Sequence, residues 1–149
     1  PEPQRSILEK KLILEVSKYK KPVLFVKGIV EKEQIVKQIG TVLYYNYMTT
    51  NQLQQAFNES ETILCRSGYT SIMDLIKLNK KAFLIPTVGQ YEQEYLSEKL
   101  KNEGVFYGSN QDNFKIEMLE DVYSNHKHLF FETTINWQHL FSVFEVEKS

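Results

Sequence analysis

Cysteine is nearly absent from this sequence, since Cys65 is the only one among 149 residues. A single cysteine excludes a disulfide within the chain and a zinc site built on several thiolates. An excess of basic charge is also missing, because the net charge is −1 at pH 7. The chain therefore lacks the electrostatic footprint of nucleic-acid binding. No apolar run approaches the roughly 20 residues of a membrane-spanning helix, and no signal-peptide pattern opens the sequence.

What is present is the composition of an ordinary globular domain. Hydrophobic residues make up 42% of the chain and charged residues 25%, which is typical of such domains. A chain of 149 residues can bury a substantial core in one domain. Internal repeats, low-complexity tracts and linkers are not evident. The sequence therefore predicts a single domain over residues 1–149.

Short apolar runs alternate with stretches of helical periodicity. The apolar runs predict buried strands, because parallel strands lack hydrophobic alternation; they cover residues 23–26, 41–45, 62–65, 82–85 and 105–107. Apolar spacing of three and four residues predicts helices; they cover residues 6–19, 50–57, 70–78, 91–103, 111–123 and 133–147. The polar segment 31–38 is either a loop or a short helix. Alternating strands and helices predict βαβ units, a parallel sheet, and ligand binding at the carboxyl ends of its strands.

The stretch Cys65–Leu75, which reads CRSGYTSIMDL, carries the first candidate site. A glycine turn follows a predicted strand there, and Gly68 would let the backbone come close to a ligand. The helix after it begins with unpaired N–H groups and a partial positive charge. Thr70 and Ser71 add hydroxyl groups at this helix start. The combination predicts a binding site for a phosphate or diphosphate.

Asp74 lies one turn further along the same predicted helix. As an anion it does not suit a phosphate, but it can accept hydrogen bonds from the vicinal hydroxyls of a ribose. The alternative is that Thr70, Ser71 and Asp74 merely cap a helix. Arg66, just before the glycine, is either an anion ligand or an ordinary surface residue. Phosphate at the helix start and ribose on the nearby acid would together indicate a nucleotide.

A second polar corner follows at Pro86–Glu94, which reads PTVGQYEQE. Gly89 and Gln90 form its turn, and Gly89 again permits close approach. Gln93 and Glu94, in the first turn of the next predicted helix, offer an amide and a carboxylate for sugar hydroxyls. The alternative is a solvated acidic first turn favoured by the helix dipole. Because the two corners occur in successive strand–helix units, we expect one ligand to lie across both.

A metal site is not expected. The histidines His126 and His128 do not share a helix face, and His139 lies in an aromatic stretch. Surface or packing roles are favoured for all three, since no third ligand lies nearby. No Ser-His-Asp or Cys-His pattern indicates nucleophilic catalysis either.

Taken together, these motifs resemble the C-terminal domain of family 28 glycosyltransferases, a group that includes the enzyme forming lipid II from UDP-N-acetylglucosamine. The resemblance rests on Cys65–Leu75, on KKAFLIPTVGQYEQEYL at Lys80–Leu96 and on PEPQR at Pro1–Arg5. It implies an α/β fold with a Rossmann-like parallel sheet flanked by helices, the donor-binding half of a GT-B glycosyltransferase. It also implies a UDP-sugar donor, usually UDP-N-acetylglucosamine, and an inverting reaction without metal or cofactor.

The resemblance also implies roles for individual residues of the first corner. Arg66, Ser67 and Gly68 match the family's arginine-serine-glycine turn. Ser71 falls at the hydroxyl that meets the diphosphate. Asp74 falls at the acidic residue on the ribose, where the lipid II enzyme has a glutamate.

At the second corner, Gln93 and Glu94 fall where the lipid II enzyme has a glutamine pair near the sugar. Glu94 departs from that pair. Pro1–Arg5 takes the place of that enzyme's glycine-rich loop. The resemblance thus puts the donor sugar beside the second corner.

The resemblance assigns the catalytic base to a separate N-terminal, acceptor-binding domain, so no catalytic residue is expected in this chain. The chain would then be a donor-binding half that is inactive as an isolated fragment. Because the family's domain starts with a strand at the sheet centre, we expect the natural chain to continue upstream of Pro1. Two alternatives are a stand-alone nucleotide-sugar-binding subunit that pairs with a separate acceptor-binding chain, and half of a UDP-sugar epimerase. The expected location is cytoplasmic, with peripheral attachment to the inner face of the membrane through the other half.

Overall fold

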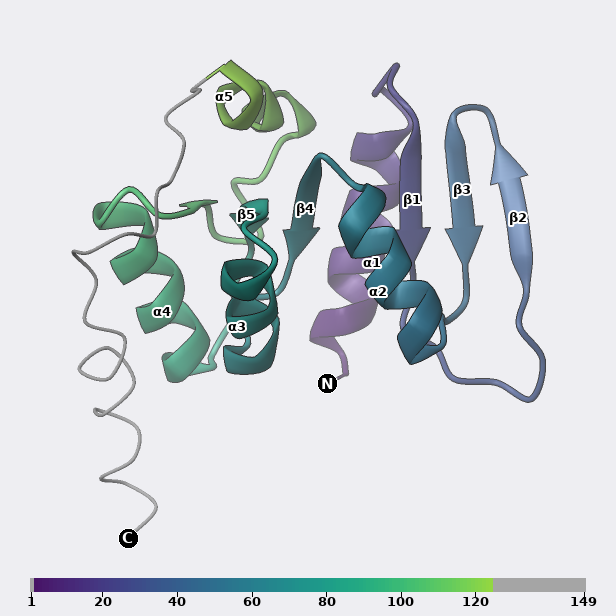
Figure 1. Cartoon of the computed structure of the whole chain (residues 1–149), viewed down its shortest axis with the longest axis horizontal. Coiled ribbons are helices and arrows are strands. Elements are labelled where there is room, and N and C mark those ends of the chain that lie inside the picture. Colours follow the sequence, from purple (N-terminus) through teal and green to yellow (C-terminus); the bar gives the residue numbers. More distant parts are fainter. Residues whose placement is uncertain (1, 125–149) are drawn as a thin grey trace, which may run out of the picture.

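Helices and strands alternate along residues 2–124, the part of the chain that the computed structural model describes (Figure 1). The strands are β1 (Val23–Val26), β2 (Val36–Ile39), β3 (Val42–Tyr45), β4 (Thr62–Cys65), β5 (Lys81–Leu84) and β6 (Tyr107–Gly108). The helices are α1 (Gln4–Val16), α2 (Thr50–Glu59), α3 (Tyr69–Lys77), α4 (Tyr91–Asn102), the 3-10 turn η1 (Ile116–Met118) and α5 (Leu119–Ser124). The expected α/β class is confirmed.

The strands form two three-stranded sheets, in the orders β1-β3-β2 and β4-β5-β6. All neighbouring strands are parallel except β2, which runs antiparallel to β3. In the described part of the chain β1 pairs only with β3, and β4 pairs only with β5. Each of these two strands therefore keeps one edge without a strand partner. Figure 1 shows them pointing the same way on either side of the centre of the molecule.

Apolar side chains on the two faces of the sheets form two cores. On one face, Ile63 and Leu84 pack with residues of α3 and α4. On the other face, Phe83 and Ile85 pack with α1, η1 and α5, and also with Phe25 of the first sheet. Strand β5 is thus buried on both sides, as its uninterrupted apolar run predicted. The second core joins the two sheets into one body although no hydrogen bonds between strands link them.

Strand β2 corrects the expectation of a loop or short helix over residues 31–38. All four of its residues are exposed, so the apolar pattern that reveals a buried strand is missing. Its conformation comes from pairing with β3, in the register Val36 opposite Tyr45 and Ile39 opposite Val42. Pairing of this kind overrides a weak local preference.

The helix predicted over residues 111–123 is wrong in its first half. A turn and η1 precede α5. Side chains take the backbone groups that a helix would use, since the Asn113 amide donates to the Asn110 side chain at 2.9 Å. The Ile116 amide donates to the Glu15 carboxylate at 2.9 Å. Ile116, Leu119 and Val122 are buried. The helix predicted over 133–147 lies outside the described residues.

Gly108 is the glycine whose replacement should cost the most stability. A Cβ there would lie 2.9 Å from the Leu84 carbonyl oxygen and 2.9 Å from the Ser97 hydroxyl. The Leu84 carbonyl is backbone and cannot yield. We expect Gly108→Ala to lower the free energy of unfolding by about 1–3 kcal/mol, measured by urea denaturation.

Gly68→Ala is the matched control for this experiment. A Cβ at Gly68 meets no atom within 4 Å, and its φ of −71° suits any residue. We expect its free energy of unfolding to fall by no more than about 1 kcal/mol, the cost of replacing a glycine N-cap by alanine. Equal effects of the two substitutions would show that β5 and β6 do not approach this closely.

Glu15 makes stability depend on pH. Its carboxylate accepts hydrogen bonds from the Ile116 amide and, at 2.9 Å, from the Lys18 ammonium. The Ile116 hydrogen bond is the main cause that lowers the pKa of Glu15. Because the folded pKa is lowered, this stabilisation is complete above about pH 4.3, where a glutamate in an unfolded chain titrates. It is lost as pH falls below that value.

The substitution Glu15→Gln tests this dependence. We expect the parent chain to lose more stability between pH 7 and pH 3 than the variant, as measured by urea midpoints. Glu61→Gln serves as the control, because Glu61 is exposed. An equal loss of stability in the parent and in Glu15→Gln would contradict the assignment of this pH dependence to Glu15.

Candidate functional site

The two polar corners lie side by side at the carboxyl ends of β4 and β5. The strands are parallel neighbours with Cys65 opposite Leu84. An Nη1 hydrogen of Arg66 is donated to the Pro86 carbonyl at 2.9 Å. The Ser67 hydroxyl donates to the Gln93 carbonyl at 2.8 Å. The fold therefore brings both corners together at one edge of the sheet, and the expectation that one ligand lies across them stays a prediction.

The first corner leaves its polar side chains available. Helix α3 starts after Gly68, which makes no side-chain cap. Thr70 and Asp74 are exposed and Ser71 is half-buried. Among residues 2–124, no hydrogen bond or ion pair occupies these three side chains. The alternative that they serve as helix caps therefore finds no support.

Backbone amides reinforce this opening. The Ile72 amide makes the first intrahelical bond of α3, to the Gly68 carbonyl at 3.0 Å. The amides of Thr70 and Ser71 precede that bond and have no carbonyl within the helix. The partial positive charge of a helix start lies at the same place. The corner can thus receive an anion with backbone and hydroxyl donors.

The second corner holds its own loop in shape. The Gln93 side chain accepts from the Thr87 amide at 2.9 Å and donates to the Gln90 side chain at 2.6 Å. Glu94 accepts from the Gly89 amide at 3.0 Å. These bonds fix the turn over residues 86–90 against the start of α4. The acidic first turn is therefore more than a solvated surface, although Glu94 itself is exposed.

The glycines at the two corners face open space. A Cβ added at Gly68 or at Gly89 would meet no atom within 4 Å. Gly89 also has a φ of +81°, a conformation that L side chains rarely adopt. Both positions therefore leave room for a ligand close to the backbone.

Arg66 lies beneath the corners and is fully engaged with oxygen acceptors. Besides the Pro86 carbonyl, its guanidinium donates to the Ile85 carbonyl at 3.5 Å, the Gln4 carbonyl at 3.0 Å and the Gln111 side chain at 2.8 Å. Burial lowers the pKa of its guanidinium. Ser67 is fully buried. Both residues thus support the corner from below in this structure.

Gln4 and Gln111 join the site without any signal in the sequence. They are 62 and 45 residues away from Arg66 along the chain. Glutamines in unremarkable positions carry no spacing that would mark them. Only the folded chain brings the start of α1 and the loop after β6 to the same edge.

The comparison with protein-family models decides the family. Residues 5–129 match the model described as glycosyltransferase family 28 C-terminal domain. The chain belongs to this family. A search of curated proteins and a search of solved structures each found no match. The family 28 domain is the part of a glycosyltransferase that binds a nucleotide-sugar donor and is linked to an acceptor-binding domain.

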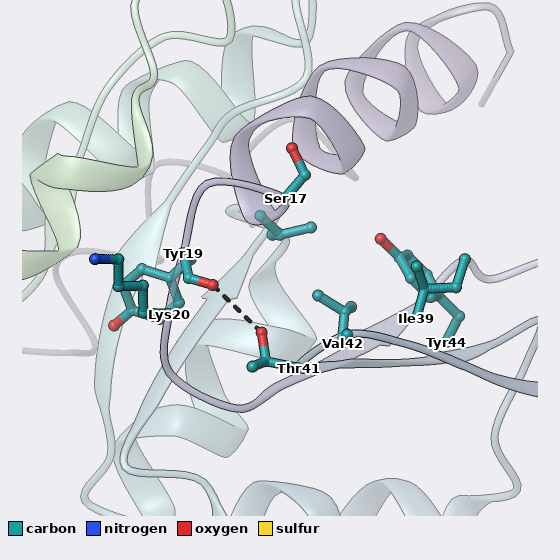
Figure 2. Close-up of a pocket in the computed structure, with 9 residues that line it drawn as sticks. Ser17, Tyr19, Lys20, Ile39, Thr41, Val42 and Tyr44 are labelled. Atoms are coloured by element: carbon teal, nitrogen blue, oxygen red, sulfur yellow. Dashed lines mark hydrogen bonds between the residues drawn. The ribbon is translucent and has the colours of Figure 1, made fainter.

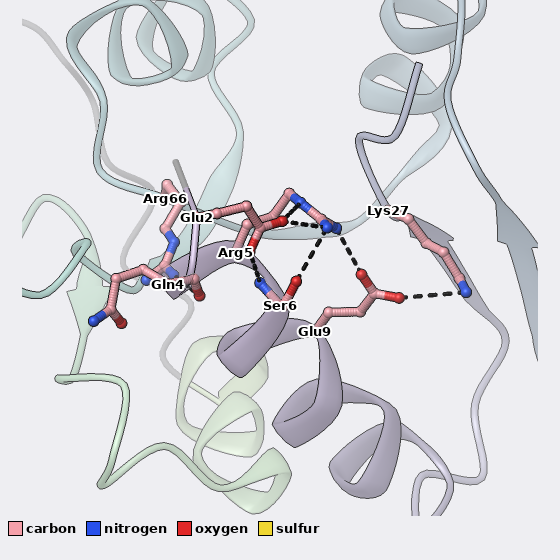
Figure 3. Close-up of polar contacts among 7 residues, drawn as sticks. All are labelled: Glu2, Gln4, Arg5, Ser6, Glu9, Lys27 and Arg66. Carbon is pink, nitrogen blue, oxygen red and sulfur yellow. Dashed lines mark hydrogen bonds and ion pairs between the residues drawn. The ribbon is translucent and has the colours of Figure 1, made fainter. Parts of the chain in front are cut away.

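The start of α1 brings a further group of charges to this edge of the family 28 domain. Figure 3 shows Arg5 between Glu2 and Glu9, with Glu9 also paired to Lys27. The distances are 2.7 Å from Arg5 to Glu9 and 3.3 Å from Lys27 to Glu9. This network ties the first turn of α1 to the segment after β1.

Cys65 is the single thiol of the family 28 domain. Burial raises the pKa of its thiol to about 12, so the thiol stays protonated at neutral pH. Among residues 2–124, no group of three His, Cys, Asp or Glu side chains is placed to hold a metal ion. The three histidines lie outside that part of the chain. No helix in the same residues is long and apolar enough to cross a membrane.

A surface hollow of about 440 Å³ lies at the start of β3, in the sheet β1-β3-β2 (Figure 2). The end of α1 and the turn between β2 and β3 form it, with Tyr19, Ile39 and Tyr44 among its lining residues. Thr41 donates to the Tyr19 carbonyl beside it at 3.3 Å. None of the predicted site residues lines this hollow.

Proposed function

We propose that the chain is the donor-binding half of an inverting, metal-independent glycosyltransferase that uses UDP-N-acetylglucosamine. The observation that carries this proposal is the pair of adjacent corners at the carboxyl ends of β4 and β5. One corner offers unoccupied donors and a carboxylate, and the other offers an amide and a carboxylate on a fixed loop. The diphosphate of a nucleotide sugar suits the unoccupied donors, its ribose suits the carboxylate of the first corner, and its hexose suits the second corner.

The diphosphate binds at the start of α3. The Thr70 and Ser71 amides and hydroxyls donate to its oxygens, and Gly68 lets it approach the backbone. The dipole of α3 favours its negative charge. Helix α4 also begins at this edge, so two helix starts serve one anion.

Asp74 binds the ribose. It follows Thr70 by four residues and Ser71 by three, so all three share one face of α3. That face is opposite the fully buried Ile72 and Leu75. A carboxylate there accepts hydrogen bonds from both ribose hydroxyls without opposing the phosphates directly.

The second corner binds the sugar. Gly89 and Gln90 line its turn, and Gln93 and Glu94 present their side chains at the start of α4. Both side chains hold the loop through one oxygen each. A carboxylate keeps a second oxygen for sugar hydroxyls, and the Gln93 amide can exchange its Gln90 partner for one.

The reaction needs little from this half beyond electrostatics. The acceptor oxygen attacks the anomeric carbon, the bond from that carbon to the diphosphate oxygen breaks, and a base on the acceptor-binding half takes the acceptor proton. Negative charge then develops on the departing UDP. The helix starts and hydroxyls stabilise that charge where it forms.

The domain is completed by a strand between β1 and β4, supplied by a segment upstream of Pro1. Two observations support this part of the proposal. Both strands have an edge without a strand partner, and both point toward the edge where the N-terminus lies (Figure 1). A strand parallel to both would end where α1 starts and would pair the open backbone groups.

Titration with UDP tests the donor assignment. Binding that depends on Asp74 supports it, and no heat at millimolar UDP contradicts it. The alternative that the acceptor half is a separate chain is tested by reading the coding sequence upstream of Pro1. A contiguous upstream domain favours one chain, and an adjacent frame for a membrane-associated partner favours two.

A further inference from the structure

The edge of the site contains a half-buried cation, Arg66, without a carboxylate partner. Arg66 donates to the backbone carbonyls of Ile85 and Pro86, to the Gln4 carbonyl and to the Gln111 side chain. All of these acceptors are neutral. None of the ion pairs among residues 2–124 includes Arg66. Its positive charge is therefore held beneath both corners and is not cancelled locally.

Gln111 determines how that cation is held. Its side chain is 2% exposed, so it is removed from solvent. Its oxygen accepts from Arg66 at 2.8 Å, and its nitrogen donates to the Gln4 side chain at 3.2 Å. A buried amide with both ends satisfied fixes the orientation of its partners. Gln111 thus links the start of α1 to the arginine under the corners.

We propose that Gln111 is a positioning residue of the donor site, acting through Arg66. It holds the guanidinium under the corners and, being neutral, leaves the arginine charge available to the diphosphate above. This role rests on the proposed function, because it assumes an anionic donor. Gln111 touches no substrate in this role, and its amide fixes a cation whose charge acts across the corner. In a partly buried site such a charge is weakly screened.

Two substitutions of Gln111 distinguish its role in holding Arg66 from the effect of the arginine charge. Gln111→Glu keeps an oxygen acceptor for Arg66, loses the hydrogen bond that Gln111 donates to Gln4, and adds a negative charge that cancels the cation. Gln111→Leu removes both hydrogen bonds and leaves Arg66 without that acceptor. The matched control is Gln38→Glu on the exposed strand β2, which adds the same charge in the other sheet.

The first measurement is amide hydrogen exchange without ligand. We expect Gln111→Leu to speed exchange in both corners, residues 66–71 and 86–90. Gln111→Glu should leave that exchange close to the parent, because the acceptor remains. This measurement does not depend on any donor, so it tests the holding role even if the proposed function fails.

The second measurement compares UDP with uridine by isothermal titration. We expect Gln111→Glu to weaken UDP binding by about tenfold, with uridine affinity unchanged and the difference shrinking at high salt. Gln38→Glu should bind both as the parent does. A merely structural role would weaken UDP and uridine equally.

Distinct outcomes overturn the proposal. Unchanged corner exchange in Gln111→Leu would show that Gln111 holds nothing. UDP binding by Gln111→Glu that equals the parent would show that the arginine charge does not serve the diphosphate. Failure of the parent chain to bind UDP, with the exchange result intact, would overturn the proposed donor and the charge role together while leaving the holding role established.

Discussion

Replacement of Asp74 by alanine is expected to weaken UDP binding about tenfold or more, measured by isothermal titration of the 149-residue chain. The Asp74 carboxylate is exposed and has no partner among residues 2–124. A hydrogen bond to a charged acceptor contributes about 1.5–3 kcal/mol, and 1.4 kcal/mol is about tenfold in affinity. The thermal midpoint should not change, because the side chain makes no contact that folding needs.

Asp121→Ala is the matched control, since Asp121 is an exposed aspartate near the start of α5. It should bind UDP as the parent does. Gly68→Ala tests the proposed phosphate site independently. Its added Cβ meets no protein atom within 4 Å but takes up space beside the start of α3. It should fold normally and lose UDP affinity. No binding at millimolar UDP, or equal affinity of Asp74→Ala and the parent, would refute the donor assignment.

The addition of a strand upstream of Pro1 is expected to stabilise the chain strongly. Strands β1 and β4 each have an edge that pairs with no other described strand. An inserted strand would satisfy backbone groups on both and bury apolar surface between α1 and α2. We expect a run of about six valine and isoleucine residues, joined to Pro1 by a short polar turn, to raise the thermal midpoint by about 5 °C or more.

The control for this experiment is the same added run with prolines at two interior positions. Proline cannot donate to a neighbouring strand, so it is excluded from the centre of a sheet. Amide exchange should slow in β1 and β4 with the first version alone. Equal thermal midpoints for the two versions, or slower exchange only in β2 at the outer edge, would refute a central strand.

The exposed side chains around the unpaired edges are consistent with such a strand. Leu24 of β1 is 37% exposed, Ile7 of α1 is 47% exposed and Leu53 of α2 is 41% exposed. Helix α2 has no buried residue at all, although its polar and apolar residues are clearly segregated. An apolar strand would give these helices a surface to cover. Open parallel edges are otherwise prone to pairing with other chains.

Much of the fold could be predicted because its strongest signals are local. The strands β1, β4 and β5 are mostly apolar, apart from Thr62 and Lys81 at the start of β4 and β5. Parallel strands that are covered on two faces require such a composition. Thr49 caps α2 together with Gln52, which is a signal between residues close in the chain. Such signals depend on near neighbours in the chain, so the folded state preserves them.

The predictions that proved wrong concern segments whose conformation is not set by near neighbours in the chain. Strand β2 is fully exposed and takes its conformation from β3. The segment before α5 is shaped by Glu15, which lies 101 residues away from Ile116. Strand β6 starts two residues later than expected, at Tyr107, where it pairs with Phe83 of β5. Each of these depends on contacts between distant segments, which no local pattern records.

The candidate site also combines features that the sequence predicted with features that only the fold shows. The helix start at Thr70 and Ser71 was recognisable from residue types and spacing, as was the position of Asp74 one turn later. The sequence did not distinguish residues that face a ligand from residues that hold the corner. The tertiary structure shows Arg66 and Ser67 bonded beneath the corner, with Thr70 and Asp74 exposed above it.

By itself the sequence determined the alternation of strands and helices, the two corners and the resemblance to family 28 glycosyltransferases. Glycine, hydroxyl and acidic residues at a strand end are a local arrangement, and local arrangements survive folding. Only the tertiary structure decided that the corners are adjacent, that Gln4 and Gln111 join them through Arg66, and that the strands form two sheets. Those facts are set by packing and hydrogen bonds between segments far apart in the chain, where composition and periodicity carry no information.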